Sequence, residues 1–236
     1  MTNSRRNFIK QVSVGSAALA TASLSACASR EESKEREIIT NPLIVPKAQG
    51  LKITGTFLDE ISHDIVHQNW GEQEWDRDFA HMKAIGIDTV IVIRSGYRKF
   101  LTYPSPYLMK TFGCYKPSVD LIDMYLRLAD KYDMTFYFGL YDSGRYWDTG
   151  DLTWEIDSNM YVIEEVWKQY GHHKSFGGWY LSQEISRATK GAIKAFASLG
   201  KQCKEVSGGL PTLISPWIDG KKAVDAASGS LTKEQA

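Results

Sequence analysis

A run of β-branched and other apolar residues lies within DTVIVIRSGY, residues 88–97. The run lacks the alternation of polar and apolar positions that marks a strand with one face in water. Such a run is typical of a strand that is buried on both faces, as in a parallel sheet. The segment therefore predicts a central strand of an α/β domain.

Strand patterns and helix patterns alternate on both sides of this run. Four more strands are predicted, in the segments LKITGTFLDEI (51–61), MTFYFGLYD (134–142), FGGWYLSQEI (176–185) and LPTLISPWID (210–219). The spacing of apolar residues predicts helices that start near Glu72, at Ser118 and near Asp157, a helix over 188–206, and a last helical start at Lys221. This alternation predicts βαβ units with parallel strands and right-handed crossovers.

Two architectures fit these units, an open doubly wound sheet and a (β/α)8 TIM barrel. No Gly-rich phosphate-binding fingerprint follows the first strand, which disfavours a nucleotide-binding open sheet. Polar and aromatic residues instead follow every predicted strand, at the end where a barrel carries its chemistry. The sequence therefore favours the barrel. A barrel takes about 250 residues. Only about five βα units fit in 51–236, which indicates either a truncated barrel or an open sheet.

The N-terminal residues resemble an export signal. SRRNFIK, residues 4–10, resembles the twin-arginine motif, and the apolar stretch after it is shorter than the roughly 20 residues of a membrane-spanning helix. LSAC, residues 24–27, resembles the lipobox of bacterial lipoproteins, in which the cysteine is acylated. An ordinary signal peptide with a chance cysteine is the alternative.

These motifs predict three segments. They are a lipoprotein signal peptide over 1–26, a lipidated Cys27 with a flexible tether over 27–50, and a partial barrel domain over 51–236. The predicted location is outside the cytoplasm, anchored by lipid to a bacterial membrane and facing the periplasm or the cell exterior.

Charge and cysteine content exclude some kinds of partner. Removal of residues 1–26 takes away three basic residues and no acidic one, which changes the formal net charge from 0 to −3. Such a chain gives no reason to expect a nucleic acid partner. Cys114 and Cys203 are expected to be free thiols, with a disulfide as the alternative. His63 and His67 have a metal-binding spacing but lie in a predicted loop, so neither a metal nor a cofactor is predicted.

The residues that follow parallel strands converge at one end of a sheet. The polar and aromatic residues at these positions are Asp59, Glu60, Arg94, Tyr97, Asp142, Tyr146, Trp147, Gln183, Glu184, Trp217 and Asp219. Carboxylates and arginine can hydrogen-bond sugar hydroxyls, and aromatic rings can stack on sugar C–H surfaces. Two acids can also hydrolyse a glycosidic bond, one as general acid and the other as nucleophile or base. The pattern therefore predicts a carbohydrate site.

Glu184 is the predicted general acid/base, with Asp59 and Glu60 as further candidate catalytic acids. Arg94 is a predicted anchor for a hydroxyl or a uronic carboxylate, and Asp142 a sugar-binding acid. Predicted stacking platforms are Tyr146, Trp147 and Trp217; Tyr97, Gln183 and Asp219 complete the predicted substrate-binding set. The alternative for any of the acids is a structural role, as a helix cap or as the partner of a nearby arginine.

Five segments together resemble the bacterial domain of unknown function 4434 family. They are GTFLDEISHDIVHQNWGEQEW (55–75), MKAIGIDTVIVIRSGY (82–97), YFGLYDSGRYWD (137–148), FGGWYLSQEIS (176–186) and GLPTLISPWIDGKKAV (209–224). The resemblance implies a (β/α)8 barrel related to glycoside hydrolases, of a kind common in exported proteins of carbohydrate-degrading bacteria. It also implies a domain that continues beyond Ala236.

Gln183 and Glu184 resemble the strand-four ending of a large clan of retaining glycosidases, in which an Asn-Glu pair supplies the acid/base. This chain has glutamine in place of asparagine, and it has no counterpart of strand seven, where that clan keeps its nucleophile. The resemblance thus implies a glycoside hydrolase-like, carbohydrate-active lipoprotein. The alternatives are a non-catalytic carbohydrate-binding lipoprotein and an inactive fragment of such an enzyme.

Overall fold

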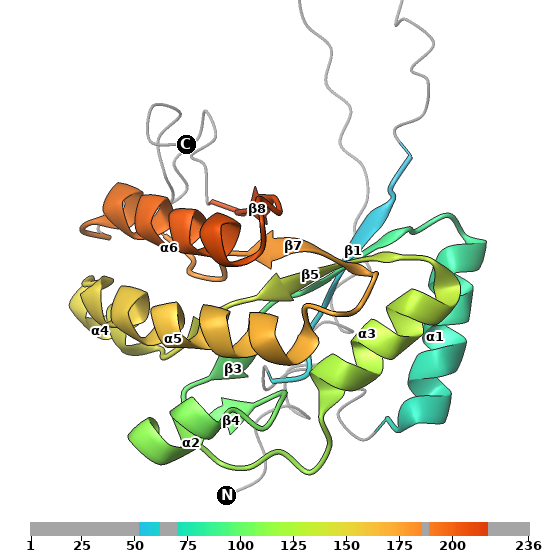
Figure 1. Cartoon of the computed structure of the whole chain (residues 1–236), viewed down its shortest axis with the longest axis horizontal. Coiled ribbons are helices and arrows are strands. Elements are labelled where there is room, and N and C mark those ends of the chain that lie inside the picture. The colour runs from blue at the N-terminus through green and yellow to red at the C-terminus, as the bar shows by residue number, and fades with distance from the viewer. Residues whose placement is uncertain (1–51, 62–69, 186–188, 217–236) are drawn as a thin grey trace, which may run out of the picture. The chain divides into compact units, whose positions relative to one another are not determined.

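The computed structural model describes residues 52–61, 70–185 and 189–216, all within one compact unit, Gly50–Ala236 (Figure 1). The predicted signal peptide, the tether and Cys27 lie outside the described residues. Trp217 and Asp219, the two predicted ligands from the last strand segment, also lie outside them, as do His63 and His67.

The main sheet contains five parallel strands in the order β1-β2-β5-β7-β8. Their bounds are Gly55–Leu58, Thr89–Val92, Thr135–Gly139, Phe176–Tyr180 and Thr212–Leu213. The spatial order follows the sequence throughout, whereas a doubly wound sheet reverses its order at a switch point. The predicted barrel is therefore confirmed: the described residues form four βα units and the fifth strand of a (β/α)8-type fold.

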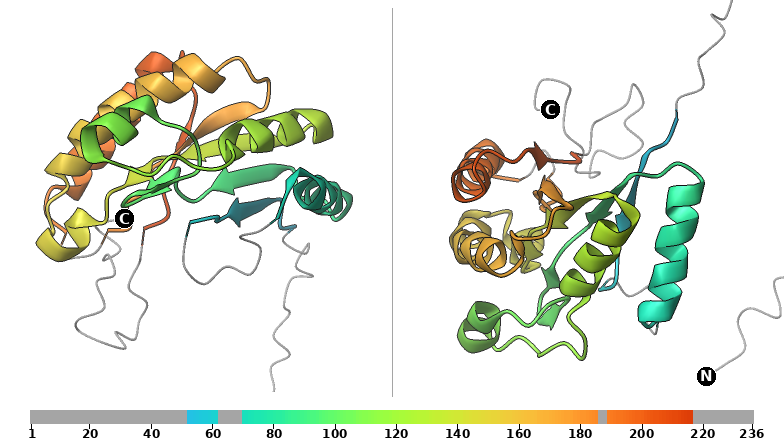
Figure 2. Two further views of the ribbon diagram at one scale, coloured as in Figure 1. Left: turned by 90° about the horizontal axis from the view of Figure 1, so that it is seen from below. Right: turned by 45° about the vertical axis from the view of Figure 1, so that its right-hand side comes forward.

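Four long helices connect the strands: α1 (Glu72–Ala84), α3 (Leu121–Tyr132), α5 (Thr153–Tyr170) and α6 (Ala192–Val206). They lie on the outer side of the curved sheet (Figure 2). Neighbouring helices pack in pairs, α1 against α3 and α5 against α6. No helix in the described part of the chain is long and apolar enough to cross a membrane.

The hydrophobic core lies between the sheet and these helices. Side chains from alternate strand positions fill it, including Val90, Val92, Phe136, Phe138 and Trp179, none more than 1% exposed. This is the burial on the helix side that the apolar runs of the strands predict.

The other face of the sheet is strongly concave. The rings of Phe57 in β1 and Tyr180 in β7 lie in edge contact, with centroids 5.1 Å apart, although β2 and β5 separate their strands. In a flat sheet, three strand spacings would hold β1 and β7 about 14 Å apart. The contact therefore shows that the sheet curls as a barrel wall does.

Three helices begin at residues other than those predicted. The helix expected from Ser118 begins at Leu121, because the Asp120 carboxylate caps it by accepting the Asp123 N–H at 3.0 Å. The helix expected near Asp157 is one turn longer and begins at Thr153. The helix expected from 188 begins at Ala192, after a glycine with φ of 74°.

The predicted strands 88–97 and 134–142 each divide in two. After β2 and β5 the chain continues into a small sheet of order β4-β3-β6, formed by Phe100–Leu101, Gly96–Tyr97 and Tyr141–Asp142. Gly139 lies at the division, and a Cβ atom there would lie 2.0 Å from the carbonyl oxygen of Val92. Only glycine allows this close approach. The sequence does not predict the short helices α2 (Pro106–Phe112) and α4 (Arg145–Thr149).

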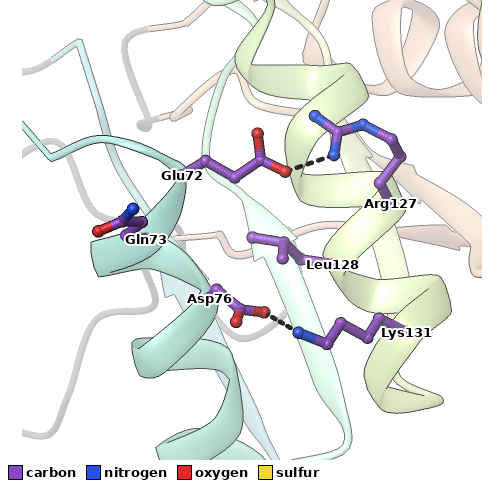
Figure 3. Close-up of a pocket in the computed structure, with 6 residues that line it drawn as sticks. All are labelled: Glu72, Gln73, Asp76, Arg127, Leu128 and Lys131. Atoms are coloured by element: carbon purple, nitrogen blue, oxygen red, sulfur yellow. Dashed lines mark hydrogen bonds and ion pairs between the residues drawn. The ribbon is translucent and has the colours of Figure 1, made fainter.

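A notch in the outer layer lies between α1 and α3 (Figure 3). Arg127 contacts Glu72 at 2.6 Å and Lys131 contacts Asp76 at 2.6 Å, so the two basic residues of one helix pair with acids of the other. The charges that line the notch are therefore balanced. We assign it to helix packing, because exposed ion pairs of this kind add little to stability.

Candidate active site

A cluster of three charged side chains lies beyond the C-terminal ends of β2, β5 and β7. The Arg94 guanidinium lies between two carboxylates, with Nη1 3.2 Å from Oδ2 of Asp142 and Nη2 3.9 Å from Oε1 of Glu184. The three residues come from three successive βα units. Parallel strands predict that the residues after them converge at one end of the sheet, and these three side chains meet there.

The Asp142 carboxylate is the most buried member, with its side chain 1% exposed. Its Oδ1 accepts the Gly144 N–H at 2.7 Å, and its Oδ2 also lies 3.4 Å from the Tyr146 hydroxyl. Burial raises the pKa of Asp142 above its usual value, and the Gly144 N–H and Arg94 offset this rise only in part. The arginine that pairs with Asp142 is therefore Arg94, which follows another strand, and not an arginine close to it in the sequence.

Glu184 is more accessible, with 28% of its side chain exposed. It lines a pocket of about 280 Å³ together with Tyr146, Trp147 and residues 148–150 of the α4 segment. Its backbone N–H donates to the Tyr146 hydroxyl at 3.1 Å, which joins the loop after β7 to α4. A partly exposed carboxylate at a pocket wall can exchange protons with a bound molecule.

Trp147 provides an exposed aromatic surface at the same pocket. Its side chain is 50% exposed, and its ring stacks on Tyr146 with centroids 5.1 Å apart. Tyr146 itself is buried. Of the predicted platforms that the structure describes, Trp147 can therefore offer a free face to a sugar, whereas Tyr146 supports it from below.

Tyr97 and Gln183, both predicted to bind substrate, make contacts within the protein. The Tyr97 ring lies beneath the guanidinium groups of Arg94 and Arg98, at 5.1 and 5.3 Å. The cation–π contact with Tyr97 helps to fix the position of the Arg94 guanidinium. The Gln183 amide is 4% exposed and donates to the Tyr141 carbonyl oxygen at 3.0 Å. Both contacts fix the cluster in place.

Asp59 and Glu60 follow β1, the strand next to β2. The Asp59 carboxylate accepts the Ile61 N–H at 3.0 Å. Burial, together with the Asp59 charge, raises the pKa of Glu60 to about 7. The pKa of Tyr125 in α3 is raised by burial and by the charges of Glu60 and Asp59. The Glu60 and Asp59 carboxylates thus lie within electrostatic range of Tyr125, whereas Glu184 lines the pocket.

Sequence reasoning missed two polar residues beside the cluster, Glu155 and Asn159 of α5. Both are fully buried. Asn159 bonds Tyr141, on one side of Asp142, and Glu155 bonds Ser143, on the other side. One signal for them was present, because they share the helix face of the core residues Val162 and Val166. Because the helix is predicted to start at Asp157, Glu155 falls outside it, and its position on the same helix face as the core residues is not recognised.

Among residues 52–61, 70–185 and 189–216, no three His, Cys, Asp or Glu side chains come together as metal ligands. Cys114 and Cys203 are both buried free thiols, as the sequence predicts.

The fold and the cluster at its strand ends define a (β/α)8-type barrel domain. The chain belongs to the family described as "Domain of unknown function (DUF4434)", whose sequence profile matches residues 53–235. No curated protein matches the chain at a significant level.

The chain is also similar to solved structures. A crystal structure of a putative alpha-L-fucosidase from Bacteroides thetaiotaomicron is 68% identical, with a TM-score of 0.72 over 92% of this chain. The chain spans 63% of that protein's length. A second structure, alpha-L-fucosidase isoenzyme 2 from Paenibacillus thiaminolyticus, is 12% identical with a TM-score of 0.45, covering 68% of this chain and 32% of its own. This second likeness is too weak to support an inference.

Proposed function

We propose that the chain belongs to a carbohydrate-active domain of the glycoside hydrolase type, with Glu184 as general acid/base. One observation carries the proposal. Arg94 holds the carboxylates of Asp142 and Glu184 together, at a pocket whose wall includes the half-exposed ring of Trp147. Glycoside hydrolysis requires a pair of carboxyl groups, and a cation and an aromatic face are groups that can bind the sugar.

Each group has a part in this chemistry. Glu184 protonates the glycosidic oxygen as the bond breaks, and Trp147 stacks against the sugar ring. Asp142 is buried and already accepts the Gly144 N–H, so its part is to orient Arg94 and the cluster. Asp59 and Glu60 remain the candidates for the second acid within this chain.

The first substrate to test is an α-L-fucoside. The Bacteroides thetaiotaomicron protein that is 68% identical is described as a putative alpha-L-fucosidase. Fucose is a neutral sugar with an apolar methyl group, which suits an exposed indole ring. Its lack of charge also suits a cluster with two carboxylates for one guanidinium.

The decisive experiment compares Glu184→Gln with the unchanged protein on a panel of α-L-fucosides and other neutral glycosides. Loss of a general acid lowers turnover by about 10²–10⁴-fold, and the loss is larger for alkyl leaving groups than for nitrophenyl groups, which leave without a proton. Glu164→Gln is the matched control, because Glu164 is exposed on α5. Equal turnover by Glu184→Gln and the parent protein refutes the assignment.

A non-catalytic carbohydrate-binding protein is the second candidate, and the exposed Trp147 favours it equally. Sugar binding that quenches the tryptophan fluorescence of the protein, with no turnover on any glycoside of the panel, would establish binding alone. The Trp147→Ala variant then loses the binding.

We also propose that the protein is exported and lipid-anchored through Cys27, on the strength of the SRRNFIK and LSAC motifs. Replacement of Cys27 by serine should move the protein from the membrane fraction to the soluble fraction of the producing bacterium. Unchanged membrane association of the variant contradicts lipidation at this residue.

A further inference from the structure

Two buried side chains of α5 hold the backbone on both sides of Asp142. Glu155 and Asn159 are four residues apart, so they project from one face of the helix. The Asn159 side chain accepts the Tyr141 N–H at 2.9 Å through Oδ1 and donates to the Tyr141 carbonyl oxygen at 2.9 Å through Nδ2. One amide thus satisfies both backbone groups of the residue before Asp142.

Glu155 makes the equivalent contacts on the other side. Its carboxylate accepts the Ser143 N–H at 3.2 Å and the Ser143 hydroxyl. Glu155 is fully buried. Burial of a carboxylate is costly unless it is hydrogen-bonded, and here both oxygens bond the single residue after Asp142.

We propose that Glu155 and Asn159 are positioning residues that aim the Asp142 carboxylate at Arg94, and through Arg94 set the place of Glu184. The catalytic consequence rests on the proposed function. With Tyr141 and Ser143 both fixed, the backbone of Asp142 has little freedom, and its side chain is held where it bonds the Gly144 N–H and Arg94. Gln183 adds a third bond to the Tyr141 carbonyl oxygen, at 3.0 Å.

The arrangement exceeds what helix packing requires. An apolar residue at position 155 or 159 would fill the same space, but it would leave the buried Ser143 or Tyr141 groups without these partners. The pKa of Glu155 is raised to about 7 by burial, which the Ser143 bonds offset only in part. The charged groups that act on it are Asp142, which raises its pKa, and Arg145, which lowers it.

A test needs a change that leaves the charge unaltered. Asn159→Leu keeps a similar volume and removes both bonds to Tyr141, and Asn159→Ser does so with a smaller side chain should the leucine variant fail to fold. We expect the pKa of Asp142, followed by carboxyl NMR titration, to rise by one unit or more, because the carboxylate loses its alignment with Gly144 N–H and Arg94. Amide exchange at Tyr141 should accelerate about 10-fold or more.

Activity supplies the second readout, on whichever glycoside the parent protein hydrolyses. Asn159→Leu and Glu155→Gln should each lower kcat by about 10–100-fold, in the range typical of residues that orient catalytic groups, with little change in KM. Glu164→Gln on the same helix should change neither value.

The outcomes separate the two proposals. An unchanged pKa of Asp142 in a folded Asn159 variant overturns the positioning role, whether or not the protein hydrolyses any glycoside. A raised pKa in a protein that hydrolyses nothing supports the positioning of Asp142 and rejects the proposed catalysis.

Discussion

At the scale of single residues, Arg94 joins the polar residues that follow three strands into one site. Its side chain is 11% exposed and faces two carboxylates. Removing one partner of a buried ion pair leaves an uncompensated charge, which destabilises a protein more than the absence of both partners does. The stability of the domain and the geometry of the site therefore depend on the same guanidinium.

Replacing Arg94 by methionine should lower the free energy of unfolding at pH 8 by about 3 kcal/mol. The deficit should shrink at pH 5, because Asp142 without Arg94 has a still higher pKa and takes up a proton. Urea unfolding at the two pH values measures both effects. Arg77→Met is the matched control: Arg77 is 70% exposed and pairs with Glu74 at 3.2 Å, so its loss should cost less than about 1 kcal/mol. A deficit that grows toward pH 5 contradicts the pairing with Asp142.

Glu155 gives a second prediction at this scale, on the pH dependence of stability. Its pKa is raised from 4.5 to about 7 in the folded protein. Between these values the folded state binds a proton that the unfolded state has lost, so the free energy of unfolding falls as pH rises through this window. The contribution amounts to about 3 kcal/mol.

Glu155→Gln is neutral at every pH and lacks this dependence. Relative to the parent protein, the variant should therefore gain stability between pH 4.5 and pH 8, by up to about 3 kcal/mol. Chemical unfolding over this pH range provides the test, with Glu164→Gln as control. If the free energies of unfolding of Glu155→Gln and the parent protein change in parallel with pH, the Glu155 carboxyl titrates normally.

At the scale of elements, the sequence predicts those features that depend on residues close together in the chain. The four long helices and the five parallel strands follow from apolar spacing within each segment. The small sheet does not, because it pairs Gly96 with Tyr141, two residues far apart in the sequence. The place where each strand divides depends on contact between neighbouring strands, which no single segment encodes.

The same distinction applies to the site. Arg94, Asp142 and Glu184 were predicted as residues that follow strands, since parallel strands end at one rim. Their ion pairs were not predicted, because side-chain direction after a strand depends on turns such as Asp142–Gly144. The roles of Glu155 and Asn159 require knowledge of which helix face meets β6.

Gly139 links these elements to the site and gives a third prediction. A Cβ at Gly139 would lie 2.0 Å from Val92 O and 2.9 Å from the backbone nitrogen of Arg94. Gly139→Ala must therefore push β5 from β2, at a cost of about 3 kcal/mol or more, and it should displace Arg94. Gly200→Ala in α6 is the control, because a Cβ there meets only ordinary contacts, with the Thr212 side chain from 3.8 Å, and should stabilise the helix by about 0.5–1 kcal/mol. Thermal unfolding of the two variants should thus shift in opposite directions.

At the scale of the whole molecule, charge is arranged unevenly. The chain is neutral by count, with 28 basic and 28 acidic residues. The outer notch between α1 and α3 balances its charges, whereas the cluster at the strand ends has two carboxylates for one arginine. Arg94 is thus already engaged, and of its two predicted ligands a sugar hydroxyl suits it better than a uronic carboxylate.

This imbalance predicts discrimination by charge. A neutral glycoside should bind at least about 10-fold more tightly than the corresponding uronide at pH 8 and low salt, because the uronide places a third carboxylate beside Asp142 and Glu184. Added salt should narrow the difference, since screening weakens repulsion between partly exposed charges. Quenching of tryptophan fluorescence that is absent in Trp147→Ala can report both affinities, because the Trp147 ring is half exposed at the pocket. Glu184→Gln removes one of the charges and should narrow the gap in the same way without added salt, whereas Glu164→Gln should leave it unchanged. Tighter binding of the uronide by the parent protein would mean that Arg94 is available to an anion after all, and would restore the uronic carboxylate as its ligand.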